Sequence, residues 1–203
     1  MVAVVDYGVG NLFSLCSSLR AIGAEAVVTD DPAVLSAADR IILPGVGAFG
    51  DAADKLRERG LFDVLRDFAK TGKPLMGICL GMQLLFEKGY EYGEHEGLGL
   101  IKGEVRPISE VIPEGLKIPH IGWNALHFEG EKSPIFRYLN EGDFVYFVHS
   151  FYGKNEDGSV IATADYGAPL TAAVGRANVY GCQFHPEKSG NVGLKILKAF
   201  CEI

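Results

Sequence analysis

The chain has 203 residues, of which 48% are hydrophobic and 22% are charged. These proportions exclude a disordered or fibrous class and predict a single globular domain spanning residues 1–203. The formal net charge of −7, without any dense run of Lys and Arg, argues against nucleic acid as a partner. No apolar stretch approaches the ~18 to 20 residues that span a bilayer, and the N-terminus lacks a basic leader. We therefore expect a cytoplasmic protein that does not insert into membranes.

The first half of the chain alternates short β-branched runs with segments of helical period. This pattern predicts an α/β fold with a mostly parallel central sheet flanked by helices. Strands are expected at Val2–Val5, Ala26–Thr29, Arg40–Leu43 and Pro74–Ile78. Helices are expected at Leu12–Ile22, after the N-cap candidate Asn11, at Asp51–Phe68 with a break at Gly60, and at Gly81–Glu87.

Beyond Gly89 the β-like segments become shorter and are separated by Gly and Pro, which predicts an antiparallel β extension of the sheet. The expected strands are Glu104–Ile108, Asn124–Phe128, Phe144–His149, Val160–Ala164 and Thr171–Val174. A last strand is expected at Val179–Phe184. An apolar stripe of Leu194, Leu197, Phe200 and Cys201 then predicts a C-terminal helix.

Cys79 lies between a predicted buried strand and a predicted helix, with Gly77 and Gly81 two positions away on either side. This GxCxG pattern is typical of a nucleophile elbow, a sharp turn that needs small flanking residues and exposes the side chain at its tip. A position at a helix N-terminus also favours the thiolate, which is the nucleophilic form. On this motif alone, an inert buried cysteine explains the residue equally well.

A second motif, His185-Pro186-Glu187, follows the last predicted strand. Because parallel strands end at a common edge of a sheet, these side chains are expected beside Cys79. The imidazole can then act as a general base and acid, while the carboxylate orients it. Metal ligation is the alternative, but no further cluster at ligand spacing supports it, so no metal site is predicted. The GVGNLF segment lacks the third glycine of a dinucleotide loop, and no cofactor is expected.

The elbow, continued as GxCxGxQ, and the late HPE resemble the signature of the class I, or triad, glutamine amidotransferases along nearly the whole chain. The resemblance implies a glutaminase in which Cys79 is the nucleophile, His185 the general base and acid, and Glu187 the orienting carboxylate. It also implies that the backbone amides of Gly45, Val46, Gly47 and Leu80 form the oxyanion hole. An ordinary β-to-α connection is the alternative for the segment Pro44–Gly50.

The same resemblance implies five residues that contact the glutamine substrate. They are Gln83, Glu91, His149, Ser150 and Phe151. Glu91 is expected to meet the α-ammonium group of glutamine. His149 is expected to act mainly through its backbone and its position, and a hydrogen-bonded strand histidine without a catalytic role is an equally good interpretation.

Four segments resemble the glutaminase subunits of imidazole glycerol phosphate synthase, an enzyme of histidine biosynthesis. They are DYGVGN, HEGLGLIKG, KIPHIGWN and HPEKSG. This implies a heterodimer with a (β/α)₈-barrel cyclase that receives the ammonia and makes imidazole glycerol phosphate and aminoimidazole carboxamide ribonucleotide. The implied interface residues are Pro119, His120, Gly122, Trp123, Asn124, Tyr146 and Lys188. Trp123 suits an interface anchor, although a lone Trp is as often part of a core.

Two other functions fit parts of the pattern. One is the glutaminase subunit of another biosynthetic amidotransferase, such as those of anthranilate or purine synthesis, although PHIGWN speaks against it. The other is a non-catalytic thiol sensor on the same fold. A sensor leaves the HPE motif and Gln83 unexplained.

Overall fold

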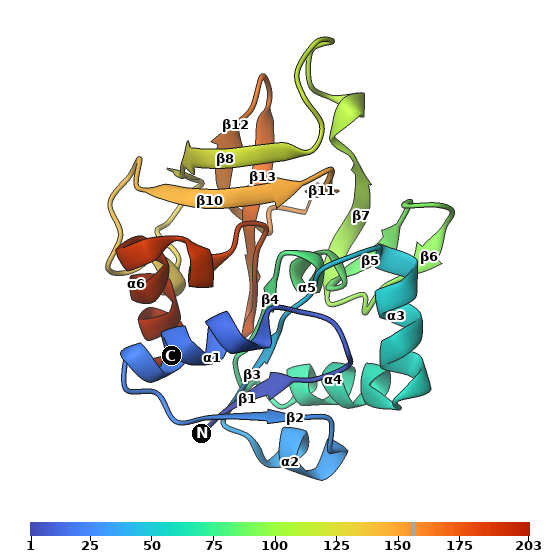
Figure 1. Ribbon diagram of the computed structural model, residues 1–203, viewed down its shortest axis with the longest axis vertical. Coiled ribbons are helices and arrows are strands. Elements are labelled where there is room, and N and C mark those ends of the chain that lie inside the picture. Colours follow the sequence, from blue (N-terminus) through green and yellow to red (C-terminus); the bar gives the residue numbers. More distant parts are fainter. Residues whose placement is uncertain (156) are drawn as a thin grey trace.

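The computed structural model describes residues 1–155 and 157–203. Within these residues, eight strands form the main sheet in the order β2-β1-β3-β4-β14-β13-β12-β9 (Figure 1). The first five in this order are β2 (Ala26–Thr29), β1 (Val2–Val5), β3 (Arg40–Leu43), β4 (Leu75–Ile78) and β14 (Val179–Cys182). They are parallel and are almost wholly buried, apart from the edge strand β2. Their continuous apolar runs reflect this burial.

The predicted antiparallel extension is confirmed on the other side of β14. It consists of β13 (Pro169–Arg176), β12 (Val160–Asp165) and β9 (His127–Phe128), each antiparallel to its neighbours. Two smaller sheets complete the fold. One pairs β10 (Phe144–His149) with β8 (His120–Ala125) and lies across the extension (Figure 1). The other contains β11 (Phe151–Lys154), β7 (Ile101–Pro107), β5 (Phe86–Gly89) and β6 (His95–Glu96). Of these strands, β5 and β6 lie beside helix α3 (Phe49–Glu58) (Figure 1).

Helices cover both faces of the parallel strands, and two apolar cores lie between the layers. The helices are α1 (Leu12–Ala21), α2 (Pro32–Ala37), α3 (Phe49–Glu58), α4 (Leu61–Lys70), α5 (Leu80–Gln83) and α6 (Gly190–Cys201). The predicted N-cap is confirmed, because the Asn11 side chain accepts from Ser14 N. Gly60, in the left-handed conformation at φ 68°, separates α3 from α4 as predicted.

The helix predicted at Gly81–Glu87 is wrong beyond its first turn. Helix α5 ends at Gln83, and the chain enters strand β5 at Phe86. Strand β5 pairs with β7 on one side and with β6 on the other. Leu84, Leu85 and Phe86 are fully buried, so the apolar run that suggested a helix face instead fills the core around a strand. Pairing with distant strands outweighed the local pattern.

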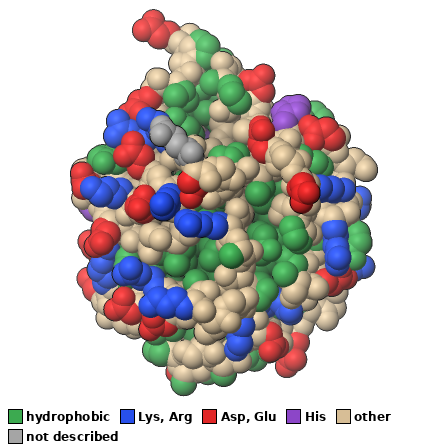
Figure 2. Space-filling model, turned by 180° about the vertical axis from the view of Figure 1, so that it is seen from behind, with side chains coloured by type: hydrophobic (Ala, Val, Ile, Leu, Met, Phe, Trp, Pro, Cys, Tyr) green, Lys and Arg blue, Asp and Glu red, His purple; other side chains and the backbone are tan. Residues whose placement is uncertain are grey.

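None of the helices in the described residues is both long enough and apolar enough to cross a membrane. The face in Figure 2 carries Lys and Arg side chains interspersed with Asp and Glu side chains.

Candidate active site

Cys79 occupies the turn between β4 and α5 in a strained backbone conformation. Its φ of 54° and ψ of −112° lie in a region that L-residues rarely adopt. The backbone N–H of Cys79 donates to the carbonyl of Cys182, 2.7 Å away on the neighbouring strand β14. This bond ties the elbow to the strand that leads into the HPE motif.

Close backbone packing explains both glycines of the elbow. A Cβ on Gly81 would lie 1.9 Å from the carbonyl oxygen of Leu43, and one on Gly77 would lie 2.5 Å from the carbonyl oxygen of Gly81. Neither neighbour can move aside, because both atoms belong to the backbone. The elbow therefore requires glycine at both positions, as the motif predicted.

His185 and Glu187 meet as the sequence predicted. His185 Nδ1 lies 2.8 Å from Glu187 Oε1, and both side chains are almost completely buried. A short 3₁₀ helix, Pro186–Lys188, holds this turn. Ser189 Oγ donates to the carbonyl of His185 at 2.7 Å and accepts from Tyr146 N at 3.0 Å, so the turn is fixed to strand β10.

The charge of the His185 ring follows from its neighbours. Burial alone would lower the pKa of His185, but hydrogen bonding to Cys79 and Glu187, together with their negative charge, outweighs burial and raises the pKa to about 9. The ring is therefore protonated at neutral pH and forms a cation between a sulfur nucleophile and a carboxylate. This arrangement is that of an activated cysteine nucleophile.

A cavity of 330 Å³ opens above Cys79 and brings most of the predicted residues together. It is lined by Val46, Gly47, Cys79, Leu80, Gln83, Glu91, Pro119, Val148, His149, Ser150, Phe151, His185 and Lys188. These residues come from segments far apart in the chain. Gly45 and Glu187 line a small adjoining space behind the triad, next to Asn11.

The loop Pro44–Gly47 is anchored at its base and exposed at its tip. Tyr7 Oη donates to the carbonyl of Pro44 at 2.8 Å, and burial raises the pKa of Tyr7, which keeps this phenol a donor. Gly45 packs against the elbow, because a Cβ there would lie 2.8 Å from Gly81 N and 2.9 Å from Leu80 Cβ. Val46 is 42% exposed. Gly47, at φ 100°, has a conformation that favours glycine.

The predicted substrate side of the cavity contains one carboxylate and one amide that are already oriented. Glu91 Oε2 accepts from Phe49 N at 2.8 Å, at the start of α3. Gln83 Nε2 donates to the carbonyl of Phe151 at 3.3 Å and to Gln183 Oε1 at 3.0 Å. Both amide hydrogens of Gln83 are therefore engaged, which leaves its oxygen as the group it can offer to a ligand.

His149 is a buried histidine with both ring nitrogens in contact with polar atoms. Nδ1 donates to the carbonyl of Phe151 at 2.8 Å, and Nε2 lies 2.9 Å from Nδ1 of the equally buried His120. Burial lowers the pKa of His149 to about 4 and also lowers that of His120. A neutral, hydrogen-bonded ring suits the positional role suggested for His149 better than proton transfer.

The predicted interface residues lie on the two-stranded sheet and at the mouth of the cavity. Trp123 is 53% exposed, so it is not part of the core, and its ring lies 5.9 Å from that of Tyr146 on the paired strand. Ile121 and Phe144 are also exposed. The prediction that His120 lies at the interface is wrong for its side chain. That side chain is buried and stacks on Phe147 and Tyr166, so it is not available for direct contact with a partner.

The remaining interface candidates also include both inward-facing and exposed residues. Asn124 points inward, where Oδ1 lies 2.7 Å from His120 Nε2 and Nδ2 donates to the carbonyl of Asp165. Gly122 is half-buried on the same strand. Pro119 and Lys188 are exposed and line the cavity.

Sequence reasoning missed two polar residues beside the triad, Gln183 and Ser189. Gln183 is fully buried, and its Nε2 donates toward Cys79 Sγ at 3.8 Å. It lies two residues before His185, at the end of a predicted strand, so side-chain alternation along that predicted strand could have suggested that both face the same side. Ser189 had no such signal, since its role depends on strand β10.

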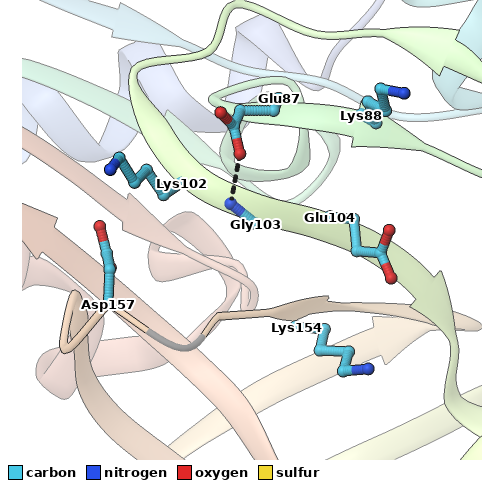
Figure 3. Close-up of a pocket in the computed structure, with 7 residues that line it drawn as sticks. All are labelled: Glu87, Lys88, Lys102, Gly103, Glu104, Lys154 and Asp157. Carbon is cyan, nitrogen blue, oxygen red and sulfur yellow. Dashed lines mark hydrogen bonds between the residues drawn. The ribbon is translucent and has the colours of Figure 1, made fainter.

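A larger cavity, of 570 Å³, lies away from the triad among β5, β7 and β11 (Figure 3). Its lining residues are Glu87, Lys88, Lys102, Gly103, Glu104, Lys154 and Asp157. Glu87 accepts from Gly103 N at 2.9 Å, and Lys88 pairs with Glu94 at 2.6 Å. No cysteine or histidine lines this cavity, so the grouping of Cys79 with His185 belongs to the smaller one.

The described part of the chain contains no cluster of three or more His, Cys, Asp or Glu side chains that could hold a metal ion. Its four cysteines are free thiols. Cys182 is completely buried, and burial raises its pKa. The triad cysteine is therefore the one thiol of the described residues that lines the candidate site.

Comparison with known proteins agrees with this geometry. The family described as "Glutamine amidotransferase class-I" matches residues 3–202. Proteins named "Imidazole glycerol phosphate synthase subunit HisH" are 52% identical in Wolinella succinogenes and 54% identical in Aquifex aeolicus. The matches cover 100% and 97% of this chain, and 100% and 94% of those proteins.

Solved structures share the fold at much lower identity. A structure titled "Crystal structure of glutamine amidotransferase" matches with a TM-score of 0.76 at 21% identity, covering 100% of both chains. A chain of PurLQS from Thermotoga maritima matches with a TM-score of 0.76 at 24% identity, covering 99% of this chain and 97% of that one. These likenesses establish the architecture, and the relatives above carry the functional information.

Proposed function

Since the chain belongs to the class I glutamine amidotransferases and is the glutaminase subunit of an imidazole glycerol phosphate synthase in histidine biosynthesis, we propose that Cys79, His185 and Glu187 are its catalytic triad. The observation that carries this proposal is the placement of His185. The ring lies between the elbow thiol and a buried carboxylate that is 2.8 Å from its Nδ1. The other ring nitrogen is left to exchange a proton with the reacting groups.

The reaction begins when the thiolate of Cys79 attacks the side-chain amide carbon of glutamine. The C–S bond forms and the C=O π electrons move onto oxygen, which gives a tetrahedral oxyanion. His185 donates its proton to the nitrogen, the C–N bond breaks and ammonia leaves. Water then attacks the resulting thioester while His185 removes a proton from it, and the departure of glutamate regenerates the thiolate.

We assign the oxyanion hole to backbone amides of Leu80 and of the segment Gly45–Gly47. Leu80 begins α5, so its N–H has no partner within the helix. Gly47 is exposed and has a positive φ. Because glycine adopts positive and negative φ about equally well, the peptide group beside it can rotate. Donors directed at the developing negative charge usually make the largest single contribution to acyl-transfer catalysis.

Glutamine itself fits the polar groups around the cavity. Glu91 supplies a carboxylate for the α-ammonium group, and the free oxygen of Gln83 is a second acceptor for it. The backbone of Ser150 and Phe151 and the position of His149 complete the far wall. Phe49 N holds the Glu91 carboxylate, and the carbonyl of Phe151 holds the side chains of Gln83 and His149. Because these side chains are already fixed, less entropy is lost when glutamine binds.

The partner we propose is the (β/α)₈-barrel cyclase subunit, in a heterodimer through which ammonia passes without entering bulk water. Protonation in water would convert ammonia into non-nucleophilic ammonium. The exposed Trp123 and Phe144, with the half-buried Tyr146, provide an aromatic face of the kind found at interface centres. Pro119 and Lys188 connect that face to the cavity.

We further propose that the isolated chain hydrolyses glutamine poorly and is activated by the cyclase with its nucleotide bound. The exposed tip of the loop Pro44–Gly47 is the element that would respond, by turning a peptide N–H toward the oxyanion. The chain would act as one domain over residues 1–203. Its free cysteines suit a reducing, cytoplasmic compartment.

The test is glutamate release by the complex, with and without the cyclase nucleotide. Cys79→Ala should abolish release, whereas Cys16→Ala, at a half-buried cysteine of α1, should leave it intact. Unchanged release by Cys79→Ala would remove the assignment, and the protein would then be a scaffold or thiol sensor. Equal release by the isolated chain and the liganded complex would refute the activation.

A further inference from the structure

Gln183 is a fully buried polar residue that the triad mechanism does not use. It follows strand β14 and lies two residues before His185. Its amide lies between two polar groups of the active site. Oε1 accepts from Gln83 Nε2 at 3.0 Å, and Nε2 donates to Cys79 Sγ at 3.8 Å. A buried amide at this place needs a reason beyond packing, because burying polar groups is costly.

The orientation of this amide follows from a fixed point in the backbone. The carbonyl of Phe151 can only accept, so the nitrogen of Gln83, 3.3 Å away, must face it. The same nitrogen lies 3.0 Å from Gln183, so the oxygen of Gln183 must face Gln83. The nitrogen of Gln183 therefore faces the sulfur. Phe151, Gln83 and Gln183 form a chain in which each donor and acceptor is determined by the one before.

Other stabilisation of a thiolate at this site is limited. Helix α5 has four residues, so its dipole is small compared with that of a long helix. The N–H of Cys79 is engaged with the carbonyl of Cys182. His185 supplies a positive charge, but it must give up its proton during the reaction. An amide N–H beside the sulfur adds a permanent donor in a poorly hydrated place, where such interactions are strengthened.

We propose that Gln183 is a positioning residue that stabilises and orients the Cys79 thiolate, with Gln83 fixing the direction of its amide. The inference rests on the proposed role of Cys79 as nucleophile. It gives Gln83 a second role behind the cavity wall, distinct from contact with the substrate. It also explains why a glutamine is buried here when an apolar side chain would fill the same space at lower cost.

The test measures alkylation of Cys79 by iodoacetamide as a function of pH in the full chain, read by mass spectrometry of the Cys79 peptide. Gln183→Leu should raise the midpoint of the reaction by about one pH unit, because the thiolate loses its amide donor. Gln183→Glu retains an acceptor for Gln83 but places a carboxylate beside the sulfur, so it should raise the midpoint further. Gln83→Met frees the Gln183 amide to rotate and should give a smaller shift in the same direction.

The half-buried Cys16 is the internal control, because its peptide is read in the same digest and its midpoint should not move. Unshifted midpoints for Cys79 in Gln183→Leu and Gln183→Glu would overturn the inference. If Gln183→Leu fails to fold, Gln183→Glu and Gln83→Met still decide the question. Failure of the proposed function is separate: it would appear as glutamate release by Cys79→Ala, whatever the alkylation profiles.

Discussion

Gly193, on the second turn of α6, supports the triad from outside the active site, and its replacement by Ala tests this support. The side chain of an alanine would have to occupy space filled by the backbone of the HPE turn. Its Cβ would lie 1.8 Å from the carbonyl oxygen of Pro186, whereas ordinary contact begins at 3.4 Å. Helix α6 or the turn must therefore move by the difference, about 1.6 Å.

Packing determines whether helix α6 or the HPE turn moves. Ile196, Leu197 and Phe200 of α6 are fully buried in the core, and moving them would open cavities. The turn is held by hydrogen bonds: the two of Ser189, and the bond from His185 N to the carbonyl of Tyr146 at 3.0 Å. We therefore expect the turn to move and His185 with it. A ~1 Å misplacement of a catalytic group can cost about 10²-fold in rate.

Stability should fall as well, although alanine is the better helix former. Replacing glycine by alanine within a helix raises the free energy of unfolding by about 0.5–1 kcal/mol, while overpacking lowers it by about 1–3 kcal/mol. Because the clash is with the backbone, the upper part of that range applies, and the net loss is about 2 kcal/mol. For a chain of this size the Tm should then fall by about 4–8 °C.

The assay is glutamate release by the complex, together with thermal unfolding of the isolated chain. Lys195→Ala, at an exposed position of the same helix, is the matched control and should change neither quantity appreciably. A Gly193→Ala variant whose kcat stays within about twofold of the wild type would refute the argument. A lowered Tm with unchanged kcat would mean that α6 moves and the turn does not.

Three further predictions concern the charge of the triad, the exposed aromatic face and the buried histidine pair. Glu187→Gln should lower kcat of the complex by on the order of 10³-fold, because it removes a negative charge that helps to keep His185 protonated. Trp123→Ala should weaken binding of the cyclase by at least ~30-fold in calorimetric titration, the loss expected of an interface anchor. His149 has a folded pKa of about 4 against 6.5, so the unfolded chain binds more protons between these values. Acidification across this range should therefore remove about 3 kcal/mol of stability in urea unfolding, and His149→Asn should reduce that loss to the part that His120 contributes.

Each of these has a contrary outcome, and the first two have a matched control. Glu141→Gln alters a similar but exposed pair with His127 and should leave kcat unchanged; an equal loss would point to a general charge effect. Val28→Ala, at an exposed position of β2, should not affect cyclase binding, and undiminished binding by Trp123→Ala would exclude the aromatic face. If His149→Asn loses as much stability in acid as the wild type, other groups carry the pH dependence.

The boundaries of the parallel strands could be predicted because they depend on local information. A strand buried on both faces is a continuous apolar run, and the parallel strands Val2–Val5 and Arg40–Leu43 have the predicted bounds. The helix predicted beyond Gln83 failed because its apolar residues fit a helix or a strand equally well. Only the presence of β7, which follows it in the chain, decided the matter.

The amino-acid sequence by itself determined which side chains meet at the candidate site. The GxCxG and HPE motifs predicted that Cys79, His185 and Glu187 lie together, because an elbow needs glycines at set positions and strand ends meet at one sheet edge. Tertiary structure alone decided which polar groups surround them. The bonds of Gln183 to Gln83 and Cys79, of Ser189 to His185 and Tyr146, and of His149 to His120 join segments with no common local pattern. Such contacts depend on the distance and angle between packed elements, which no periodicity in the chain records.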